Sequence, residues 1–382
     1  MNVLEIGSRS FRKCRSVMLN EAGLLEHLIA AVSWLLHAHE KAGDGGISKG
    51  YDLLRGKWAP SYPETTGYTI PTLLNVSTRT NDSRLLPFVK QLGTYLLSQA
   101  NDKGGVVHWD SSKYSAPVVF DTGQVIFGWL ACWQVFREDR FLDSAIKAGD
   151  WLVAIQSPDG DWKKNQHLGV EKVIDTRVSW SLLELSKHAN QGKYRIAAQS
   201  NLDWVLTQQR QNGWFEKCSF YRGDYPITHT LAYTAEGLLE CGIRLDDQRY
   251  ISASKLTADA FLSLQRSDGS LAGSYDQDWR ARSFSSCLTG NCQIANIWLR
   301  FYKITGEIDY LNAARRAIEF VAGIQDVATR SPDMRGAIPG SFPVFGSYER
   351  LKYPNWATKF FIDSLLLLDE MVAGCAMNYL PG

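Results

Sequence analysis

The sequence has no large excess of either charge. Its 41 Lys and Arg residues nearly balance 40 Asp and Glu residues, and the formal net charge is +1. Runs of Lys or Arg, which are typical of nucleic-acid surfaces and polybasic membrane anchors, are also missing. We therefore expect no nucleic-acid partner.

Long apolar runs and a leader segment are missing as well. The longest apolar runs, 29–37 and 360–368, are shorter than the ~18 residues that a membrane span needs. Residues 1–5 begin no cationic stretch with an apolar core behind it, so we expect no signal peptide. The sequence therefore predicts a cytoplasmic protein without a membrane span. Its seven cysteines are odd in number and lack CxxC spacing, as is typical of reduced thiols: Cys14, Cys132, Cys218, Cys241, Cys287, Cys292 and Cys375.

No linker rich in Pro, Gly or Ser divides the 382 residues, and a repeat runs from end to end. We therefore expect one domain over 1–382, with 1–20 as an N-terminal extension. A fixed period of this kind is typical of stacked or ring-closed repeats. Six turn-rich segments each lead into an apolar run that opens on a polar residue, at intervals of 54 to 64 residues: Glu64, Asp121, Asp175, His229, Asn291 and Asn355.

One repeat shows the predicted unit. Residues 122–136 are apolar on almost every side, which is typical of a helix buried all round. Residues 141–155 alternate apolar and charged positions at helical spacing, as on an outer helix with one wet face. Pro and Asp-Gly within 156–162 then end the helix in a turn. Six such hairpins closing into a ring predict an all-α fold, the (α/α)6 toroid.

The polar residues that open the inner helices have two interpretations. Short polar side chains before a helix usually cap its free N–H groups, and Asp121, Asp175 and His229 are predicted at or near such caps. In a toroid, however, the N-terminal ends of the inner helices meet at one end of the central cavity. Helix N-termini favour anions, so a pocket there suits an acidic or hydroxyl-rich ligand.

Glycosidic bond hydrolysis is the leading functional prediction. It needs a protonated carboxylic acid and a second carboxylate, ~5–10 Å apart. Adjacent hairpins can supply them from Glu64, Asp121 and Asp175. The close alternative is a uronate lyase or C5-epimerase, in which His229 or Tyr233 is the base and cationic or amide groups neutralise the sugar carboxylate.

Substrate contacts are expected from the same end of the ring. Aromatic residues in the turns before the inner helices can stack on sugar rings, and polar residues of the inner helices can bind hydroxyl or carboxylate groups. The predicted substrate-binding residues are Tyr62, Tyr68, Gln124, Arg177, Trp180, Asn291, Tyr348, Tyr353, Asn355 and Lys359.

Four segments carry a family resemblance: 61–68, 119–124, 286–291 and 353–357. They resemble a family of toroid proteins encoded with bacterial exopolysaccharide genes, and the likeness extends over nearly the whole chain. More broadly, the chain is similar to six-hairpin glycosidases, to toroidal uronate-acting lyases and epimerases, and to terpenoid cyclases and protein prenyltransferases. The resemblance implies a role in exopolysaccharide metabolism, with an oligosaccharide, polysaccharide or lipid-linked glycan as substrate.

Two further alternatives remain open. A terpenoid cyclase or prenyltransferase would need a DxDD cluster or a zinc site, but the nearest acidic segment is 245–247, and Cys218, His229, Cys287 and Cys292 match no zinc spacing. The segment 156–162 fits the QxxDGxW motif of squalene cyclases, which is a structural turn. The other alternative is a non-catalytic glycan-binding scaffold. No metal or cofactor is predicted, and the oligomeric state is left open.

Overall fold

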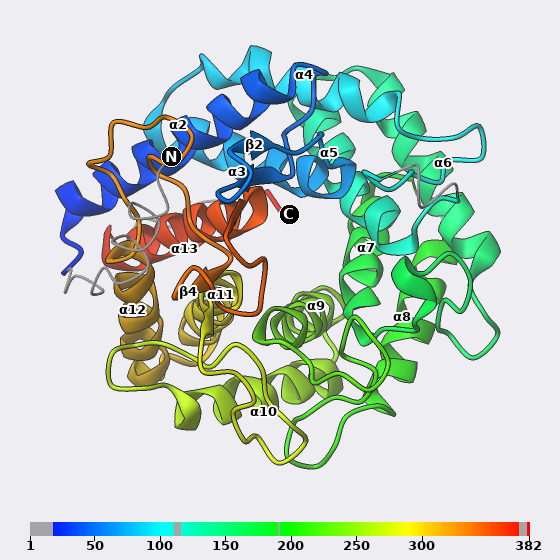
Figure 1. Cartoon of the computed structure of the whole chain (residues 1–382). Helices are drawn as coiled ribbons and strands as arrows, with labels where there is room; N and C mark the ends of the chain where they lie inside the picture. Colours follow the sequence, from blue (N-terminus) through cyan, green and yellow to red (C-terminus); the bar gives the residue numbers. More distant parts are fainter. Residues whose placement is uncertain (1–17, 111–115, 190–191, 374–379) are drawn as a thin grey trace.

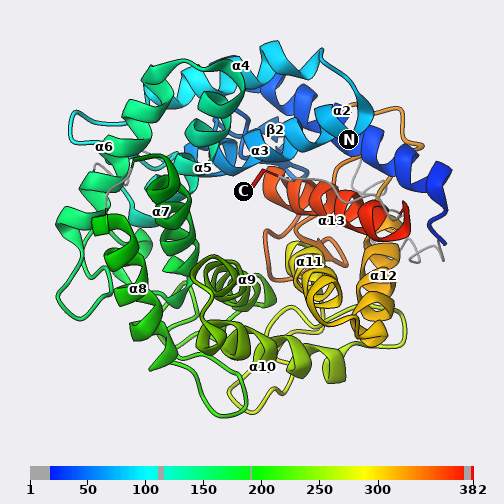
Figure 2. The same cartoon turned by 180° about the vertical axis from the view of Figure 1, so that it is seen from behind.

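The computed structural model describes residues 18–110, 116–189, 192–373 and 380–382. Within these residues, two concentric rings of six α-helices surround a central axis, which confirms the predicted all-α (α/α)6 toroid (Figures 1 and 2). The inner ring contains α3 (Pro63–Thr80), α5 (Val119–Phe136), α7 (Thr176–Ala189), α9 (Thr228–Leu245), α11 (Leu288–Thr305) and α13 (Asn355–Ala373). The outer ring contains α2 (Glu21–Ala42), α4 (Leu85–Leu97), α6 (Asp139–Ile155), α8 (Gly192–Leu206), α10 (Gln248–Leu264) and α12 (Ile308–Ala322).

Glycines let neighbouring inner helices pack closely. A Cβ atom on Gly67 of α3 would lie 2.7 Å from Cα of Val125 in α5, and one on Gly128 would lie 2.6 Å from the carbonyl oxygen of Gly67. Gly237 of α9 lies against Thr176 of α7 in the same way. Because a side chain at these positions would separate the helices, the glycines fix how near the inner helices lie to one another.

The turns after the outer helices attach each hairpin to the next. Gln156 Nε2 donates hydrogen bonds of 2.9 Å to the carbonyl oxygens of Gly160 and Ala197. Gly160 has a φ of 96°, and a Cβ there would lie 2.2 Å from a backbone oxygen of α8, so the position needs glycine. Gln209 and Gln265 make the equivalent bonds one and two repeats later. The segment 156–162 is therefore a structural turn, as predicted.

The same device closes the ring between the last and first hairpins. Gln325 Nε2 donates to the carbonyl oxygens of His27 and Gly336, and Gly336, with a φ of 84°, lies against the Ala30 backbone in α2. On the inside, α13 packs against both α3 and α2. Thus the two ends of the described chain meet in one closed wall.

Short strands lie at the N-terminal ends of the inner helices. A three-stranded antiparallel sheet has the order β2 (Lys57–Trp58), β1 (Gly50–Asp52), β5 (Lys352–Pro354), with Tyr51 opposite both Trp58 and Tyr353. β3 (Ser286–Cys287) pairs with β4 (Ser341–Phe342). Because β5 and β3 lead directly into α13 and α11, the sheets hold these helix starts in place.

Several sequence predictions concern residues or properties beyond the ring itself. Residues 1–17 of the predicted N-terminal extension, Cys14 and Cys375 lie outside the described residues. The described cysteines are buried and unpaired. In the part of the chain that the structure describes, no helix is both long and apolar enough to cross a membrane.

The inner helices α5 and α9 are capped by neighbouring loops rather than by the side chains of their own N-cap residues. The N-cap residues Val118 and Ile227 make no side-chain cap bond. Instead, the first N–H of α5 donates to the carbonyl oxygen of Asn165 at 2.9 Å, and that of α9 donates to Gly273 at 3.0 Å. Each loop of one hairpin therefore satisfies the start of the preceding inner helix.

Asp121 and His229 lie near the N-caps, as predicted, but neither is itself the N-cap residue. Both lie inside the first turn, because α5 begins at Val119 and α9 begins at Thr228. Asp175 ends a short 3-10 turn, Val173–Asp175, directly before α7. Since backbone carbonyls supply the caps of α5 and α9, the side chains of Asp121 and His229 are available for other contacts.

Candidate active site

A cavity of about 420 Å³ lies at the N-terminal end of the inner helices, and we call it the rim cavity. The first turns of α3, α5, α9 and α13 form its floor, and the hairpin loops form its walls. Of the residues predicted to form the site, it is lined by Tyr62, Glu64, Tyr68, Asp121, His229, Tyr233 and Tyr348.

Two carboxyl groups face each other in this cavity. Glu64 lies in the first turn of α3 and Asp121 in the first turn of α5, and the close packing of these helices brings the two side chains into a shared hydrogen bond. Both are buried, with 8% and 1% of their surfaces exposed. Burial, and then the charge of Asp121, raise the pKa of Glu64 well above its usual range. Within the pair, the shared hydrogen bond therefore favours a proton on Glu64 rather than on Asp121.

His108 contacts Asp121, the second carboxyl group of the pair, and favours its ionised form. Its Nδ1 lies 2.8 Å from Oδ2 of Asp121, and both side chains are buried. Burial raises the pKa of Asp121, and the contact with His108 opposes that rise. The His108 ring also packs against Tyr62 and against His167, with centroids 5.1 and 4.8 Å apart. His108 therefore favours Asp121 as the anion of the pair.

Asp175 lies behind the cavity wall rather than in it. Its Oδ2 accepts a 2.5 Å bond from Nε2 of Gln166, which does line the cavity. Burial raises the pKa of Asp175 to about 7, although Gln166 and Lys172 oppose the rise. Lys172 lines the cavity and donates to the carbonyl oxygens of His167 and Val170. Burial lowers the pKa of Lys172 to about 8, so this ammonium group beside the cavity loses its proton more easily than an exposed lysine does.

His229 and Tyr233 form the opposite side of the cavity. His229 Nδ1 lies 2.6 Å from Oε1 of Gln293, and burial lowers the pKa of His229 to about 4. The ring is thus neutral at pH 7, with its Nδ1 proton directed to Gln293 and its Nε2 able to accept a proton. Tyr233 donates a 3.5 Å bond to the hydroxyl of Tyr68, and burial raises its pKa well above the usual range.

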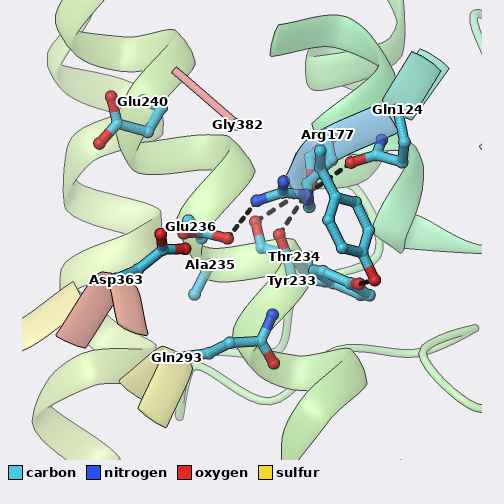
Figure 3. Close-up of polar contacts among 12 residues, drawn as sticks. Gln124, Arg177, Tyr233, Thr234, Ala235, Glu236, Glu240, Gln293, Asp363 and Gly382 are labelled. Atoms are coloured by element: carbon cyan, nitrogen blue, oxygen red, sulfur yellow. Dashed lines mark hydrogen bonds and ion pairs between the residues drawn. The ribbon is translucent and has the colours of Figure 1, made fainter. Parts of the chain in front are cut away.

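Arg177 lies one layer deeper and does not line the rim cavity. Figure 3 shows its side chain between Gln124 and Glu236. Its Nε donates to Oε1 of Gln124 at 2.9 Å, and its Nη1 pairs with Glu236. Its guanidinium also lies within 5.1 Å of the ring centroids of Trp180 and Tyr233. The structure therefore places Gln124, Arg177 and Trp180, which were predicted to bind substrate, beneath the cavity.

Lys359 belongs to the same deeper layer. It pairs with Asp363 at 2.8 Å, donates to the carbonyl oxygen of Gly382 at 3.0 Å and lies 4.2 Å from the ring centroid of Phe360. Burial lowers the pKa of Lys359. The layer built by Arg177 and Lys359 separates the rim cavity from the other end of the ring.

Three further predicted contacts hold the loops instead of lining the cavity. Asn291 Oδ1 accepts a 3.2 Å bond from the backbone of Leu271, and Asn355 Nδ2 donates to the Ser48 carbonyl oxygen at 2.9 Å. Tyr353 lies in β5. These side chains tie adjacent hairpins together at the rim.

Several residues of the cavity were not singled out as site residues from the sequence. The set contains Lys49, His108, Asp110, Gln166, His167, Lys172, Glu349 and Trp356. Most belong to irregular loops before inner helices, where periodicity gives no information on direction. One usable signal was position: His108 precedes α5 as Tyr62 precedes α3, because both lie in the loop that leads into an inner helix.

A smaller cavity of about 100 Å³ lies at the C-terminal ends of the inner helices, and we call it the far cavity. Ion pairs dominate its wall. Glu240 pairs with Arg300 at 2.8 Å and also with Arg244, which in turn pairs with Glu184. Among the described residues, no three His, Cys, Asp or Glu side chains are arranged to hold a metal ion in either cavity or elsewhere.

Known structures share this fold, whereas no protein-family model and no curated protein matches the sequence. An unsaturated glucuronyl hydrolase specific for heparin has a TM-score of 0.73 at 15% identity, over 93% of this chain and 99% of that one. The unsaturated glucuronyl hydrolase of Bacillus sp. GL1 has a TM-score of 0.72 at 15% identity, over 91% and 97% of the chains. That of Streptococcus agalactiae has a TM-score of 0.68 at 13% identity, over 94% of each. The chain therefore has the six-hairpin toroid fold found in these hydrolases.

Proposed function

We propose that the protein hydrolyses a glycosidic bond of an acidic or hydroxyl-rich oligosaccharide in the rim cavity. The observation that carries this proposal is the buried Glu64–Asp121 pair at the wall of a cavity lined by aromatic rings, in which the shared hydrogen bond favours a proton on Glu64. A group that gives a proton and a group that takes one are the two requirements of bond hydrolysis by acid–base catalysis.

The pair can supply both proton transfers. Glu64 donates its proton to the glycosidic oxygen, which leaves as a hydroxyl group, while Asp121 accepts a proton from the water that adds to the sugar carbon. Asp121 is then protonated and Glu64 ionised, and transfer across their hydrogen bond restores the starting state. Two carboxyl groups in direct contact are closer than the ~5–10 Å typical of glycosidase pairs, so we propose that they act as one unit that shares a proton.

An acidic substrate suits the electrostatics of this end of the ring. The N-terminal ends of α3, α5, α9 and α13 face the cavity, and such ends favour anions. Lys49 and Lys172 also line it. A mutant of the S. agalactiae hydrolase of this fold was solved in complex with dGlcA-GalNAc6S, and saccharides that end in an unsaturated uronate are therefore the first probes for this chain.

The biological setting is part of the proposal. The resemblance to toroid proteins encoded with exopolysaccharide genes supports a fragment of such a polysaccharide, or its lipid-linked precursor, as the substrate. We keep the cytoplasmic location expected from the sequence on the same basis.

The deciding experiment follows product formation from a panel of uronate-containing oligosaccharides. Hydrolysis produces a new reducing end, elimination adds near-ultraviolet absorbance from a new double bond, and epimerisation does neither. New reducing ends from wild-type protein, lost in Asp121→Asn, would support the proposal. Product formation unaffected by Glu64→Gln and Asp121→Asn would contradict it.

A lyase or epimerase is the second candidate, because His229 is neutral and can accept a proton through Nε2. Two observations weigh against it. The raised pKa of Tyr233 makes its phenolate costly. Arg177 and Lys359, two cations that the sequence predicted to bind substrate, are paired beneath the cavity. Elimination dependent on His229 would favour this candidate. Glycan binding without turnover would favour a scaffold.

A further inference from the structure

Exposed aromatic side chains border the rim cavity on one side. Tyr221 and Tyr225 precede α9 and are 57% and 47% exposed, and Phe284 precedes α11 and is 70% exposed. Phe345, which is half-buried, lies in the loop before α13, with its ring centroid 6.1 Å from that of Phe284. We call these four residues the aromatic ridge. They come from three consecutive hairpins of the ring.

The aromatic ridge continues from the cavity wall. Tyr221 itself lines the rim cavity, and Phe345 is two residues from Ser347, which also lines it. The loops that carry Phe284 and Phe345 are in contact, because a Cβ on Gly346 would lie 2.5 Å from the Cβ of Ser285. A molecule that leaves the cavity on this side must therefore pass over the ridge.

Tyr225 is held in place from its own side of the ridge. The Arg282 guanidinium lies 5.0 Å from the ring centroid of Tyr225, and Asp276 fixes Arg282 through two bonds of 2.9 and 2.5 Å. A ring that is braced but still half exposed is prepared for contact with another molecule.

We propose that the aromatic ridge binds the sugars of a substrate that extend beyond the rim cavity, so that the protein prefers oligosaccharides longer than a disaccharide. This inference rests on the proposed function, in which the terminal sugars occupy the cavity. Aromatic faces pack on the apolar faces of sugar rings, and the tyrosine hydroxyls can bond sugar hydroxyls. Exposed aromatic groups beside a cavity usually mark a binding surface, and the ridge's continuity with the cavity favours the glycan as its occupant.

The test compares substrates of increasing length. Di-, tetra- and hexasaccharides are prepared from one glycosaminoglycan with a polysaccharide lyase, so that each ends in the same unsaturated uronate. The variants are Phe284→Ala combined with Phe345→Ala, and Tyr225→Ala alone. Ile196→Ala is the matched control, because Ile196 is 66% exposed on α8, in the outer ring.

We expect the double variant to lose about tenfold in kcat/KM on the longer substrates, mostly through KM, and to leave the disaccharide unchanged. Tyr225→Ala should lose less, and Ile196→Ala should match wild type at every length. Equal loss at all lengths, or no loss at any, would overturn the proposal.

Binding measurements separate this inference from the proposed function. The affinity of the same three saccharides is measured by titration calorimetry with wild type and with both ridge variants. If wild type cleaves nothing but binds the longer chains more tightly, and the ridge variants lose that advantage, the ridge inference stands without hydrolysis. If affinity does not depend on length, or if the variants change only the oligomeric state seen by light scattering, the ridge has another role.

Discussion

The two ends of the ring place buried glutamates in opposite electrostatic settings. Glu64, in the rim cavity, is 8% exposed and Glu240, in the far cavity, is 5% exposed. Burial opposes ionisation of both. Glu64 faces another carboxyl group, and its pKa is raised well above the usual range. Glu240 faces Arg300 and Arg244, which outweigh burial and lower its pKa to about 2. The partner, rather than the depth of burial, decides whether each group is an acid or a structural anion.

This difference has consequences for stability. The lowered pKa of Glu240 gives stability that is present above the pKa of an unfolded Glu, near 4.5, and lost as the pH falls towards about 2. The raised pKa of Glu64 gives stability that is present below that same unfolded value and lost as the pH rises through the folded value. At neutral pH the far end therefore stabilises the ring, and the rim pair makes it less stable.

The largest expected effect is on activity at the rim. Glu64→Gln and Asp121→Asn should each reduce turnover by about 10²–10⁴-fold, because each removes one of the two proton transfers that we propose for the pair. The assay is release of reducing ends under saturating substrate. Asp143→Asn, an exposed change on α6, is the control for a carboxyl-to-amide substitution.

The corresponding carboxyl-to-amide substitution in the far cavity, Glu240→Gln, should lower the free energy of unfolding rather than the activity. Glu240→Gln removes the anion that Arg300 and Arg244 share, and breaking a buried pair of this kind costs about 3–5 kcal/mol. Urea unfolding at pH 7 measures the loss, and turnover per folded molecule should stay near wild type. If Glu240→Gln instead stopped turnover in a stable protein, the two ends would not have separate roles.

The fold and several residues of the candidate site were predictable from the sequence, because the repeating pattern of apolar runs is local. Apolar runs such as 122–136 have no wet face, and their regular spacing leaves few arrangements other than a closed ring. The first-turn residues Glu64, Asp121 and His229 were found because each opens such a run.

How far below the rim cavity each side chain of an inner helix lies was not predictable from the sequence. Gln124 is one helical turn beyond Asp121, and that turn places it under the cavity floor instead of in the wall. Arg177 was expected to bind substrate, but its partner Glu236 comes from the next inner helix. His108 was missed because its contact with Asp121 depends on the path of an irregular loop.

Asp175, a buried carboxyl group at the rim end, tests on a smaller scale whether buried carboxyl groups at this end lower the stability at neutral pH. Its pKa of about 7 lies above the ordinary value of 3.8, so wild type should lose stability as the pH rises from about 4 through 7. Asp175→Asn removes that titration. We expect the variant to gain about 1–4 kcal/mol relative to wild type between pH 4 and pH 8, measured by urea unfolding at both values. An equal difference at both pH values would show that Asp175 is ionised in the folded protein.

Substitution of His108 should have the smallest effect of these predicted changes. We expect the effect in the pH profile of activity. His108→Gln removes a partner that favours ionised Asp121, so the acidic limb of kcat/KM should move to higher pH with a loss of about tenfold at its lower end. KM should change little. A uniform loss at all pH values, with no shift of the limb, would show that His108 only supports the fold.

The closed wall limits how such a protein can change over evolution. An open solenoid can gain or lose a repeat and keep its neighbours in contact. Here the joint between Gly336 and α2 requires that the sixth hairpin meet the first, so an added or deleted hairpin would leave a gap or a clash. New specificity must therefore come from the loops at the rim, whose lengths can vary while the number of helices stays fixed.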